Sequence, residues 1–308
     1  LSVGWLVAQP TQPRKGSYIM NSSLQGKTVL VSGATAGIGQ VTARELARLG
    51  ATVVGIGRNA QKCADVAAEI RSQTGNAAVE YLVADLSLLR EVRNVAETFK
   101  NRYNRLDVLV NNAGAFYQQR QVTAEGFEMT FALNHLNYFL LTQQLLDLLT
   151  ASASARIINV SSDAHKAGKL DLADLQLEKK YNGWAAYANS KLANILFTYE
   201  LARRLAGSKV TANTLHPGFV ASNFALNNNQ GTAAKVFLAI FKPLRNLVAV
   251  SVDKGAETPI YLASSPTAEG ETGKYFVNKR AVSSSSISYD TNLARKLWDM
   301  TEEICNHN

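Results

Sequence analysis

The sequence predicts an α/β protein built on a doubly wound parallel sheet of about seven strands, with helices on both faces. Two observations predict this class. From residue 27 onward, short apolar runs rich in β-branched residues alternate with longer amphipathic stretches. A glycine-rich turn directly follows the first run and opens the first amphipathic stretch. Strands separated by helices form right-handed crossovers, and these place the strands parallel in one sheet.

The elements follow one another along the chain without a break. The first strand, 27–32, reads KTVLVS and is apolar enough to be buried on both faces. The helix after it, 38–49, ends at Gly50. The remaining expected strands have the same composition and cover 51–57, 78–84, 105–111, 155–161, 209–215 and 274–278. The remaining expected helices are amphipathic and cover 60–73, 88–102, 126–149, 184–206 and 256–263.

The composition indicates one globular domain. Of the 308 residues, 46% are hydrophobic and 18% are charged, which excludes a largely disordered chain. No linker rich in Pro, Gly or Ser divides the chain, so we expect a single domain over 21–308. Residues 1–20 are irregular, and Met20 offers a natural start, so we expect a leader there that need not be native. The run Ser283–Ser286 is expected to be a surface loop, without an assigned function.

Charge and special residues limit the function classes. The formal net charge of +8 favours anionic ligands. The positive residues are scattered and match no nucleic-acid motif, so no nucleic-acid partner is expected. The four histidines form no metal-binding motif, so no metal is expected. The two cysteines are far apart, which suits a reducing, cytoplasmic compartment. No apolar run approaches the roughly 20 residues of a spanning helix, so no transmembrane anchor is expected.

The glycine turn 32–39, SGATAGIG, points to a dinucleotide. Gly33, Gly37 and Gly39 would let the main chain turn tightly and approach a pyrophosphate, and the following helix would offer its N-terminus to that phosphate. Strand, turn and helix in this order predict a Rossmann-type nucleotide site. The alternative is a turn that only packs a helix on a strand.

The end of the second strand carries Arg58, where an NAD-dependent fold places an acidic residue for the ribose hydroxyls. A guanidinium can hold a 2′-phosphate through charge-assisted hydrogen bonds. The missing acid and Arg58 together predict NADP(H) as the cofactor. The alternative is an ordinary solvated arginine.

A serine, a tyrosine and a lysine form the candidate catalytic set. Tyr187 and Lys191 are four residues apart on an expected helix, and this spacing puts them on one face. A neighbouring ammonium group stabilises a phenolate and lowers the tyrosine pKa. Ser162 follows the expected strand 155–161, at the carboxyl edge of the sheet where ligands bind in such folds. Each residue alone could be structural.

Together these residues resemble the short-chain dehydrogenase/reductase family over nearly all of 25–300. The glycine turn is similar to the family's TGxxxGxG, with Ser32 in place of Thr. The family motifs NNAG, YxxxK and PGxVxT have their counterparts at 111–114, 187–191 and 217–222, and the helix asparagine of the catalytic tetrad matches Asn134. By resemblance the catalytic residues are Asn134, Ser162, Tyr187 and Lys191. By resemblance the cofactor contacts are Gly33, Thr35, Gly37, Ile38, Gly39, Arg58, Asp85, Leu86, Asn112, Ala113, Gly114, Tyr187, Lys191, Pro217, Gly218 and Val220.

Within the family the chain most resembles the retinol-dehydrogenase-like branch. The strings RIINVSSDAHKAGKLDL (156–172) and YANSKLANILFTYELARRL (187–205) carry this resemblance. The branch prefers NADP(H), in agreement with Arg58. The segment 223–254, which closes over substrate in the family, is apolar and suggests a lipophilic substrate. The alternatives for this segment are a packed surface helix or an oligomer contact.

The expected reaction is reversible hydride transfer between NADP(H) and a small-molecule alcohol/carbonyl pair. Tyr187 would exchange the proton, Ser162 would orient the carbonyl oxygen, and Lys191 would lower the Tyr187 pKa and hold the ribose. Asn134 would support a water relay to Lys191. The alternative function is a non-catalytic NADP(H) sensor or scaffold on the same fold.

The resemblance also bears on partners. It implies a homo-oligomer, a dimer or tetramer, that makes contact through the helices carrying Asn134 and Tyr187. The basic residues Lys235, Lys242 and Arg245 would allow peripheral contact with an acidic membrane surface.

Overall fold

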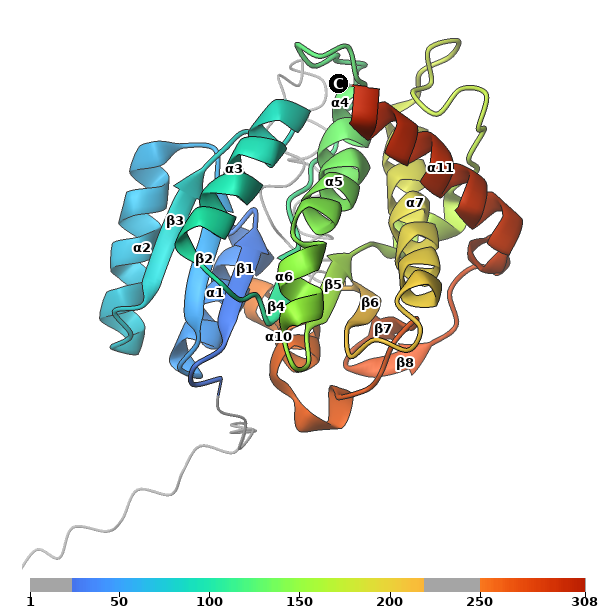
Figure 1. Ribbon diagram of the computed structural model, residues 1–308. Coiled ribbons are helices and arrows are strands. Elements are labelled where there is room, and N and C mark those ends of the chain that lie inside the picture. The colour runs from blue at the N-terminus through green and yellow to red at the C-terminus, as the bar shows by residue number, and fades with distance from the viewer. Residues whose placement is uncertain (1–23, 219–249, 308) are drawn as a thin grey trace, which may run out of the picture.

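The computed structural model describes residues 24–218 and 250–307. The expected leader 1–20 lies outside these residues, as does all of the expected substrate-covering segment except 250–254. In the described part, eight strands form a sheet in the order β3-β2-β1-β4-β5-β6-β7-β8 (Figure 1). The strands are β1 (Thr28–Ser32), β2 (Thr52–Gly57), β3 (Val79–Val83), β4 (Val108–Asn111), β5 (Arg156–Val160), β6 (Thr211–His216), β7 (Tyr275–Val277) and β8 (Arg280–Val282).

The first seven strands are parallel and confirm the expected fold class. The eighth strand, β8, runs antiparallel to β7 and pairs Val282 with Tyr275. Its three residues are all exposed, so no buried apolar run signals it in the sequence. The strand order reverses between β1 and β4. In open α/β sheets, ligands bind outside the carboxyl ends of the strands at such a reversal.

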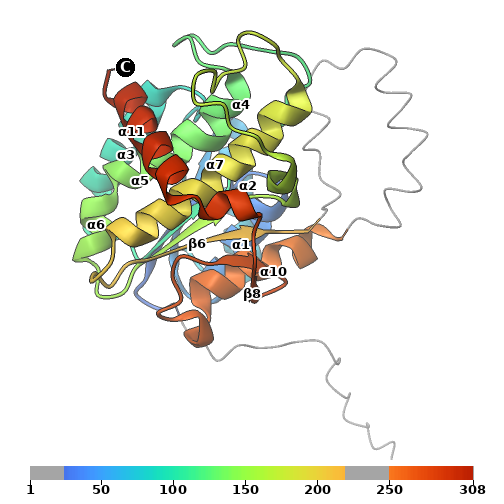
Figure 2. The ribbon, with the colours of Figure 1, turned by 90° about the vertical axis from the view of Figure 1, so that its right-hand side faces the viewer.

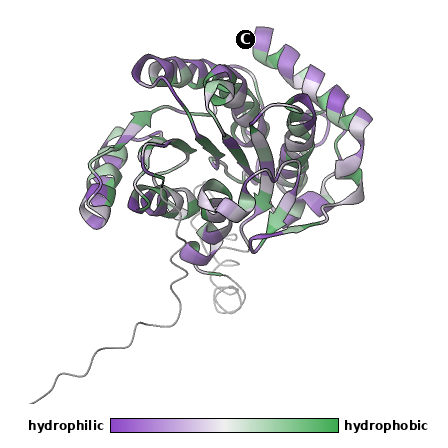
Figure 3. Ribbon diagram, turned by 60° about the horizontal axis from the view of Figure 1, so that its bottom comes forward, coloured by the Kyte–Doolittle hydropathy of each residue, from purple (hydrophilic) through white to green (hydrophobic). Residues whose placement is uncertain are grey.

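Two layers of helices enclose the sheet (Figures 1 and 2). One layer contains α1 (Gly37–Arg48), α2 (Ala60–Thr74) and α10 (Val252–Ser264), and its core includes Leu46, Ile70 and Leu262. The other contains α3 (Leu89–Arg102), α5 (Asn137–Gln144), α6 (Leu146–Ala151) and α7 (Gly183–Arg204), and its core includes Phe99 and Phe197. Hydrophobic residues accordingly concentrate on the strands and the inner helix faces (Figure 3).

The helix expected at 126–149 is not continuous. It consists of α4 (Met129–Phe131), a π-helical turn (Ala132–Leu136), α5 and α6. Three short 3-10 turns connect later elements: Asp163–Ala167, Pro266–Ala268 and Ser286–Tyr289. A π-helical turn such as Ala132–Leu136 is a frequent feature of functional sites.

The last helix, α11 (Thr291–His307), packs against α7 and α5, and Figure 2 shows it beside α7. Trp298 is 4% exposed. Its ring centroid lies 4.9 Å from that of Phe139 and 5.7 Å from that of Phe197. The Arg204 guanidinium lies 4.2 Å from the centre of the Trp298 ring. The face expected for contact between subunits is therefore covered by the chain's own C-terminal helix.

None of the described helices is both long enough and apolar enough to cross a membrane.

Candidate active site

The glycine turn follows β1 and contacts the loop that follows β4. Gly33 has φ +65°, and a Cβ there would lie 2.8 Å from the Cα atom of Ala113. The Ser32 hydroxyl accepts hydrogen bonds from the main-chain N–H groups of Asn112 (2.9 Å) and Ala113 (3.0 Å). The Asn112 amide donates back to the Ser32 carbonyl at 3.0 Å. Glycine at position 33 is thus required by the contact between the two loops, and Ser32 suffices in the place of threonine.

The helix after the turn offers a site for an anion. Ala36, the N-cap of α1, makes no side-chain capping bond, and the first turn carries no acidic residue. The first N–H groups of a helix have no partner within the helix and attract negative charge. Thr35 and Ile38 are partly exposed beside this end, while Gly39 is buried. The N-terminus of α1 therefore fits the pyrophosphate of a dinucleotide.

The expected adenosine end of the site lies at the carboxyl ends of β2 and β3. Arg58 is exposed and close enough to Tyr117 to oppose the rise that burial causes in the Tyr117 pKa. One oxygen of Asp85 accepts hydrogen bonds from the Ser87 N–H (3.0 Å) and hydroxyl (2.7 Å). The Leu86 side chain is 5% exposed and belongs to the core. Leu86 can therefore face a ligand only with its main chain.

The candidate catalytic set comes together at the end of β5. The Ser162 side chain lies close enough to the Tyr187 hydroxyl to oppose the rise that burial causes in the Tyr187 pKa. The Ser161 hydroxyl instead donates to the main-chain oxygen of Lys191 at 2.8 Å. Ser162 is thus the serine that faces Tyr187. The Lys191 Nζ atom donates to the Val160 carbonyl at 3.1 Å and lies 5.6 Å from the centre of the Tyr187 ring.

The electrostatics of this pair differ from the expectation. Burial raises the pKa of Tyr187 to about 12, and the nearby Ser162 side chain only partly opposes this shift. Burial also lowers the pKa of Lys191 to about 7. The expected lowering of the Tyr187 pKa by Lys191 is thus not found in the protein by itself. The cost of charging either group away from water outweighs their mutual stabilisation.

Asn134 connects the active-site loop to α7. Its Oδ1 accepts the N–H of Ala115 at 2.8 Å. Its Nδ2 donates to the Ala115 carbonyl and to the Ser190 hydroxyl, both at 3.0 Å. The Asn134 main-chain oxygen, which sits in the π-helical turn, accepts from the Asn194 amide at 2.8 Å. These contacts assign Asn134 a part in holding the site together; the expected water relay stays a prediction.

The remaining expected contacts line the same edge. A Cβ on Gly114 would lie 3.1 Å from Asn134 Oδ1 and 3.5 Å from Lys191 Nζ, so glycine lets this loop reach the catalytic set. Pro217 and Gly218 follow β6, and Gly218 has φ +88°. Val220 lies outside the described residues. The structure thus brings the predicted residues, Val220 excepted, to the carboxyl edge of one sheet.

Sequence reasoning missed two aromatic neighbours of Tyr187. The ring centroids of Phe116 and Trp184 lie 6.0 Å and 6.2 Å from that of Tyr187. Trp184 is 56% exposed, which is unusual for so large an apolar side chain. Both residues lie close to motifs in the sequence, in NAGAFY and GWAAYANSK.

The described residues contain no group of three or more His, Cys, Asp or Glu that could hold a metal ion.

Comparisons with known proteins agree with this geometry. Residues 27–233 match the family model described as short chain dehydrogenase. Retinol dehydrogenase 14 of Homo sapiens is 44% identical over 91% of this chain and 86% of its own length. A crystal structure of a protein from Mycobacterium paratuberculosis superposes with a TM-score of 0.74 at 34% identity, over 92% of this chain and 95% of that one. The Pseudomonas aeruginosa RhlG/NADP active-site complex superposes with a TM-score of 0.65 at 30% identity, over 82% and 95%.

Proposed function

The chain belongs to the short-chain dehydrogenase family of oxidoreductases, and from this premise we propose that it transfers hydride between NADP(H) and a lipophilic alcohol/carbonyl pair. The observation that carries the proposal is the position of Ser162 beside Tyr187, with Lys191 Nζ 5.6 Å from the Tyr187 ring centre, at the sheet edge that also holds the glycine turn. The cofactor supplies the hydride when bound. The residues below supply binding, orientation and the proton.

Tyr187 is the proposed proton donor in reduction. Because its pKa is raised to about 12, the hydroxyl is protonated at neutral pH, the form that can give a proton to a carbonyl oxygen. Ser162 would donate its hydroxyl hydrogen to the same oxygen and fix its position. Lys191, through Nζ, would hold the ribose and assist removal of the Tyr187 proton in the oxidising direction.

The choice of NADP(H) rests on Arg58. It is exposed at the end of β2, where its guanidinium can reach a 2′-phosphate. The RhlG complex, a structure similar to this chain, contains NADP. The uncapped N-terminus of α1 would hold the pyrophosphate through main-chain N–H groups.

The choice of a lipophilic substrate rests on Phe116 and Trp184. Their rings flank Tyr187, so a substrate carbonyl that reaches Tyr187 would lie against aromatic surface. Retinol dehydrogenase 14, a relative at 44% identity, acts by its name on an apolar alcohol. We therefore propose a lipophilic aldehyde, ketone or retinoid-like compound.

Two further proposals concern the whole chain. A homo-oligomer remains proposed, but through a surface other than the α5–α7 face, which α11 covers. A cytoplasmic location is proposed on the two widely separated free cysteines, Cys63 and Cys305.

The test is turnover of all-trans-retinal with NADPH by the wild type and by Tyr187→Phe. Loss of a positioned general acid lowers kcat by roughly 10²–10⁴-fold. We expect this loss, with NADPH affinity by fluorescence titration changed less than about twofold because the ring remains. Wild-type binding of NADPH without turnover of retinal or of a panel of lipophilic carbonyls would favour the sensor or scaffold alternative.

A further inference from the structure

A buried histidine stands directly behind the proposed catalytic serine. His165 lies in the 3-10 turn Asp163–Ala167, whose N-cap is Ser162, and its side chain is 0% exposed. Its Nδ1 atom lies 2.7 Å from the Ser162 carbonyl oxygen. Its Nε2 atom lies 3.1 Å from the main-chain nitrogen of Ser285. One imidazole thus bridges the turn after β5 and a loop 120 positions further along the chain.

The two partners define the protonation state of the ring. Ser285 N–H can only donate, so Nε2 must accept and carries no hydrogen. The Ser162 carbonyl can only accept, so Nδ1 must carry the hydrogen and donate. His165 is therefore neutral, in the Nδ1–H form. Burial, which lowers its pKa, agrees with this assignment.

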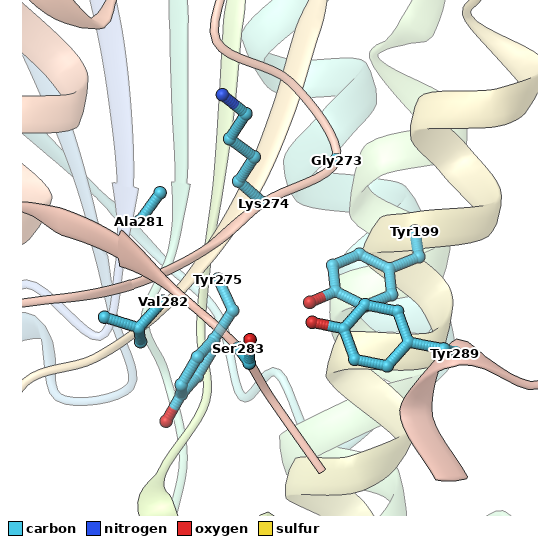
Figure 4. A pocket seen from close by; sticks show the side chains of 8 residues that line it. All are labelled: Tyr199, Gly273, Lys274, Tyr275, Ala281, Val282, Ser283 and Tyr289. Carbon is cyan, nitrogen blue, oxygen red and sulfur yellow. The ribbon is translucent and has the colours of Figure 1, made fainter. Parts of the chain in front are cut away.

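The loop on the far side is itself firmly held. The Ser284 hydroxyl is 2.8 Å from the Tyr199 hydroxyl and 2.6 Å from that of Ser288. The Ser284 N–H donates to the Tyr289 hydroxyl at 3.1 Å. Figure 4 shows Tyr199 and Tyr289 stacked beside Ser283, along a surface pocket of about 300 Å³ that Tyr275 also lines.

The β7 strand closes the arrangement from another side. The Tyr275 ring meets the His165 ring at a centroid distance of 5.0 Å and an interplanar angle of 61°. Edge-to-face contact of this kind fixes the plane of an aromatic ring. The imidazole is thus held by two hydrogen bonds and one ring contact, from three separate segments.

We propose that His165 is a positioning residue: it holds the Ser162 main chain against the C-terminal loop at Ser285, and so keeps the Ser162 hydroxyl directed at Tyr187 and the substrate carbonyl. This inference rests on the proposed function. The Ser162 side chain also accepts the Ala164 N–H at 3.2 Å, within the same turn. A displacement of the turn would therefore move the hydroxyl as well as the carbonyl of Ser162.

The decisive comparison is between two amides. Asn at position 165 places its Nδ2 where Nδ1 of histidine lies and can still donate to the Ser162 carbonyl. Gln places its terminal group where Nε2 lies and can only satisfy Ser285. We expect His165→Gln to lower kcat with retinal and NADPH about tenfold or more, since misplacement by about 1 Å costs up to roughly 10²-fold. His165→Asn keeps the contact with Ser162 and loses the one with Ser285, so it should lower kcat only several-fold, as Ser285→Pro does.

Ser285 provides a matched pair on the other side of the imidazole. Its φ of −63° is one that proline adopts, so Ser285→Pro removes the N–H donor while keeping this backbone angle. Ser285→Ala keeps the N–H and removes a hydroxyl that has no hydrogen-bond partner among the residues the structure describes. We expect Ser285→Pro to lower kcat several-fold and Ser285→Ala to leave it unchanged, with NADPH affinity unchanged in both.

The outcomes separate this inference from the proposed function. Equal kcat in His165→Gln, His165→Asn and the wild type overturns the role of His165 while the proposed function stands. A Tyr187→Phe variant with full turnover overturns the proposed function itself. If His165→Gln fails to fold, as judged by circular dichroism, the Ser285 pair decides: equal kcat in Ser285→Pro and Ser285→Ala overturns the inference.

Discussion

At the scale of single residues, burial disfavours the charged forms of both Tyr187 and Lys191 in the proposed active site. The Tyr187 pKa moves up to about 12 and the Lys191 pKa moves down to about 7. The protein alone is therefore prepared to donate a proton, as carbonyl reduction requires. Oxidation needs the phenolate, which this environment disfavours. The raised Tyr187 pKa thus keeps its hydroxyl protonated near neutral pH, and it does not by itself set the direction of the reaction.

Lys191 should make stability depend on pH. Its folded pKa lies below the unfolded value of 10.5, so between about pH 7 and 10.5 the unfolded chain binds more protons and stability rises with pH. Below about pH 7 both states hold the proton, so the cost of burying the charged Lys191 is present in full and no longer changes with pH. Relative to Lys191→Met, we expect the wild type to gain about 3 kcal/mol between pH 7 and 9.5. Urea unfolding of both proteins at the two pH values measures this gain. If the free energies of unfolding of the wild type and Lys191→Met differ by the same amount at both pH values, the prediction is contradicted.

Arg58 should decide between the two nicotinamide cofactors. A hydrogen bond to a charged group contributes about 1.5–3 kcal/mol, or roughly 10- to 100-fold in affinity. We expect Arg58→Ser to weaken NADPH binding by this factor and to leave NADH binding unchanged. Arg295→Ser, at an exposed position on α11, is the control and should change neither. Parallel fluorescence titrations give the four affinities, and equal losses for both cofactors would refute the assignment.

At the scale of elements, the strands buried in the sheet could be predicted from the sequence. The strand β8 and the position of α11 could not. A strand such as β1 is covered on both faces, so its sequence is continuously apolar. The exposed strand β8 carries no such signal. The helix α11 has the apolar spacing Ala294, Leu297, Trp298 and Thr301 of an amphipathic helix, yet it was not among the expected helices. Its position over α5 and α7 depends on tertiary contacts.

The break in the helix at Asn134 shows a second limit of local patterns. Residues 126–149 are apolar enough for one helix, but Asn134 bonds to Ala115 and Ser190 through its side chain. The adjacent Asn137 donates its amide to the Leu133 carbonyl at 2.8 Å. The partners of Asn134 come from a distant loop and from α7, whereas the Asn137–Leu133 bond lies within the helical segment itself. The sequence could therefore identify Asn134 as a site residue, but not the π-helical turn that holds it.

The packing of α11 predicts a large effect for one substitution. Trp298 lies between Phe139 and Phe197 under the Arg204 guanidinium. Trp298→Ala would remove these contacts and leave a cavity, at a cost of about 3–5 kcal/mol in the free energy of unfolding. The exposed neighbour substitution Lys296→Ala should change it by less than about 0.5 kcal/mol. Urea unfolding measures both, and a Trp298→Ala value similar to the control would mean that α11 adds little to the fold.

At the scale of the whole molecule, the site exists only when segments far apart in sequence meet at one sheet edge. The ends of β1, β2, β4, β5 and β6 each supply part of it. Their convergence could be predicted, because parallel strands end at the same edge. The pairing of Ser162 rather than Ser161 with Tyr187 agrees with the expectation, but the bridge from His165 to Ser285 has no local signal.

Because the cofactor would contact several of these segments, its binding should stabilise the whole fold. At a free NADPH concentration 100 times its Kd, the gain is about 2.7 kcal/mol. For a domain of this size that corresponds to a rise in Tm of roughly 4–5 °C. Differential scanning fluorimetry should show this rise with NADPH, retained in Tyr187→Phe and smaller with NADH at equal concentration. No rise with either cofactor would contradict the nucleotide site.

The bridge between His165 and Ser285 can form only after both residues have been synthesised. During synthesis the ribosome adds about 5–20 residues per second. The 120 positions that separate the two residues therefore take roughly 6–24 s to make. Throughout that interval the imidazole has no Ser285 to accept from, and the turn that carries Ser162 lacks its far support. A nascent chain stalled after Lys191 and before Ser285 would have its nucleotide turn, its serine and its tyrosine, yet we expect it to be a poor catalyst until Ser285 has been added.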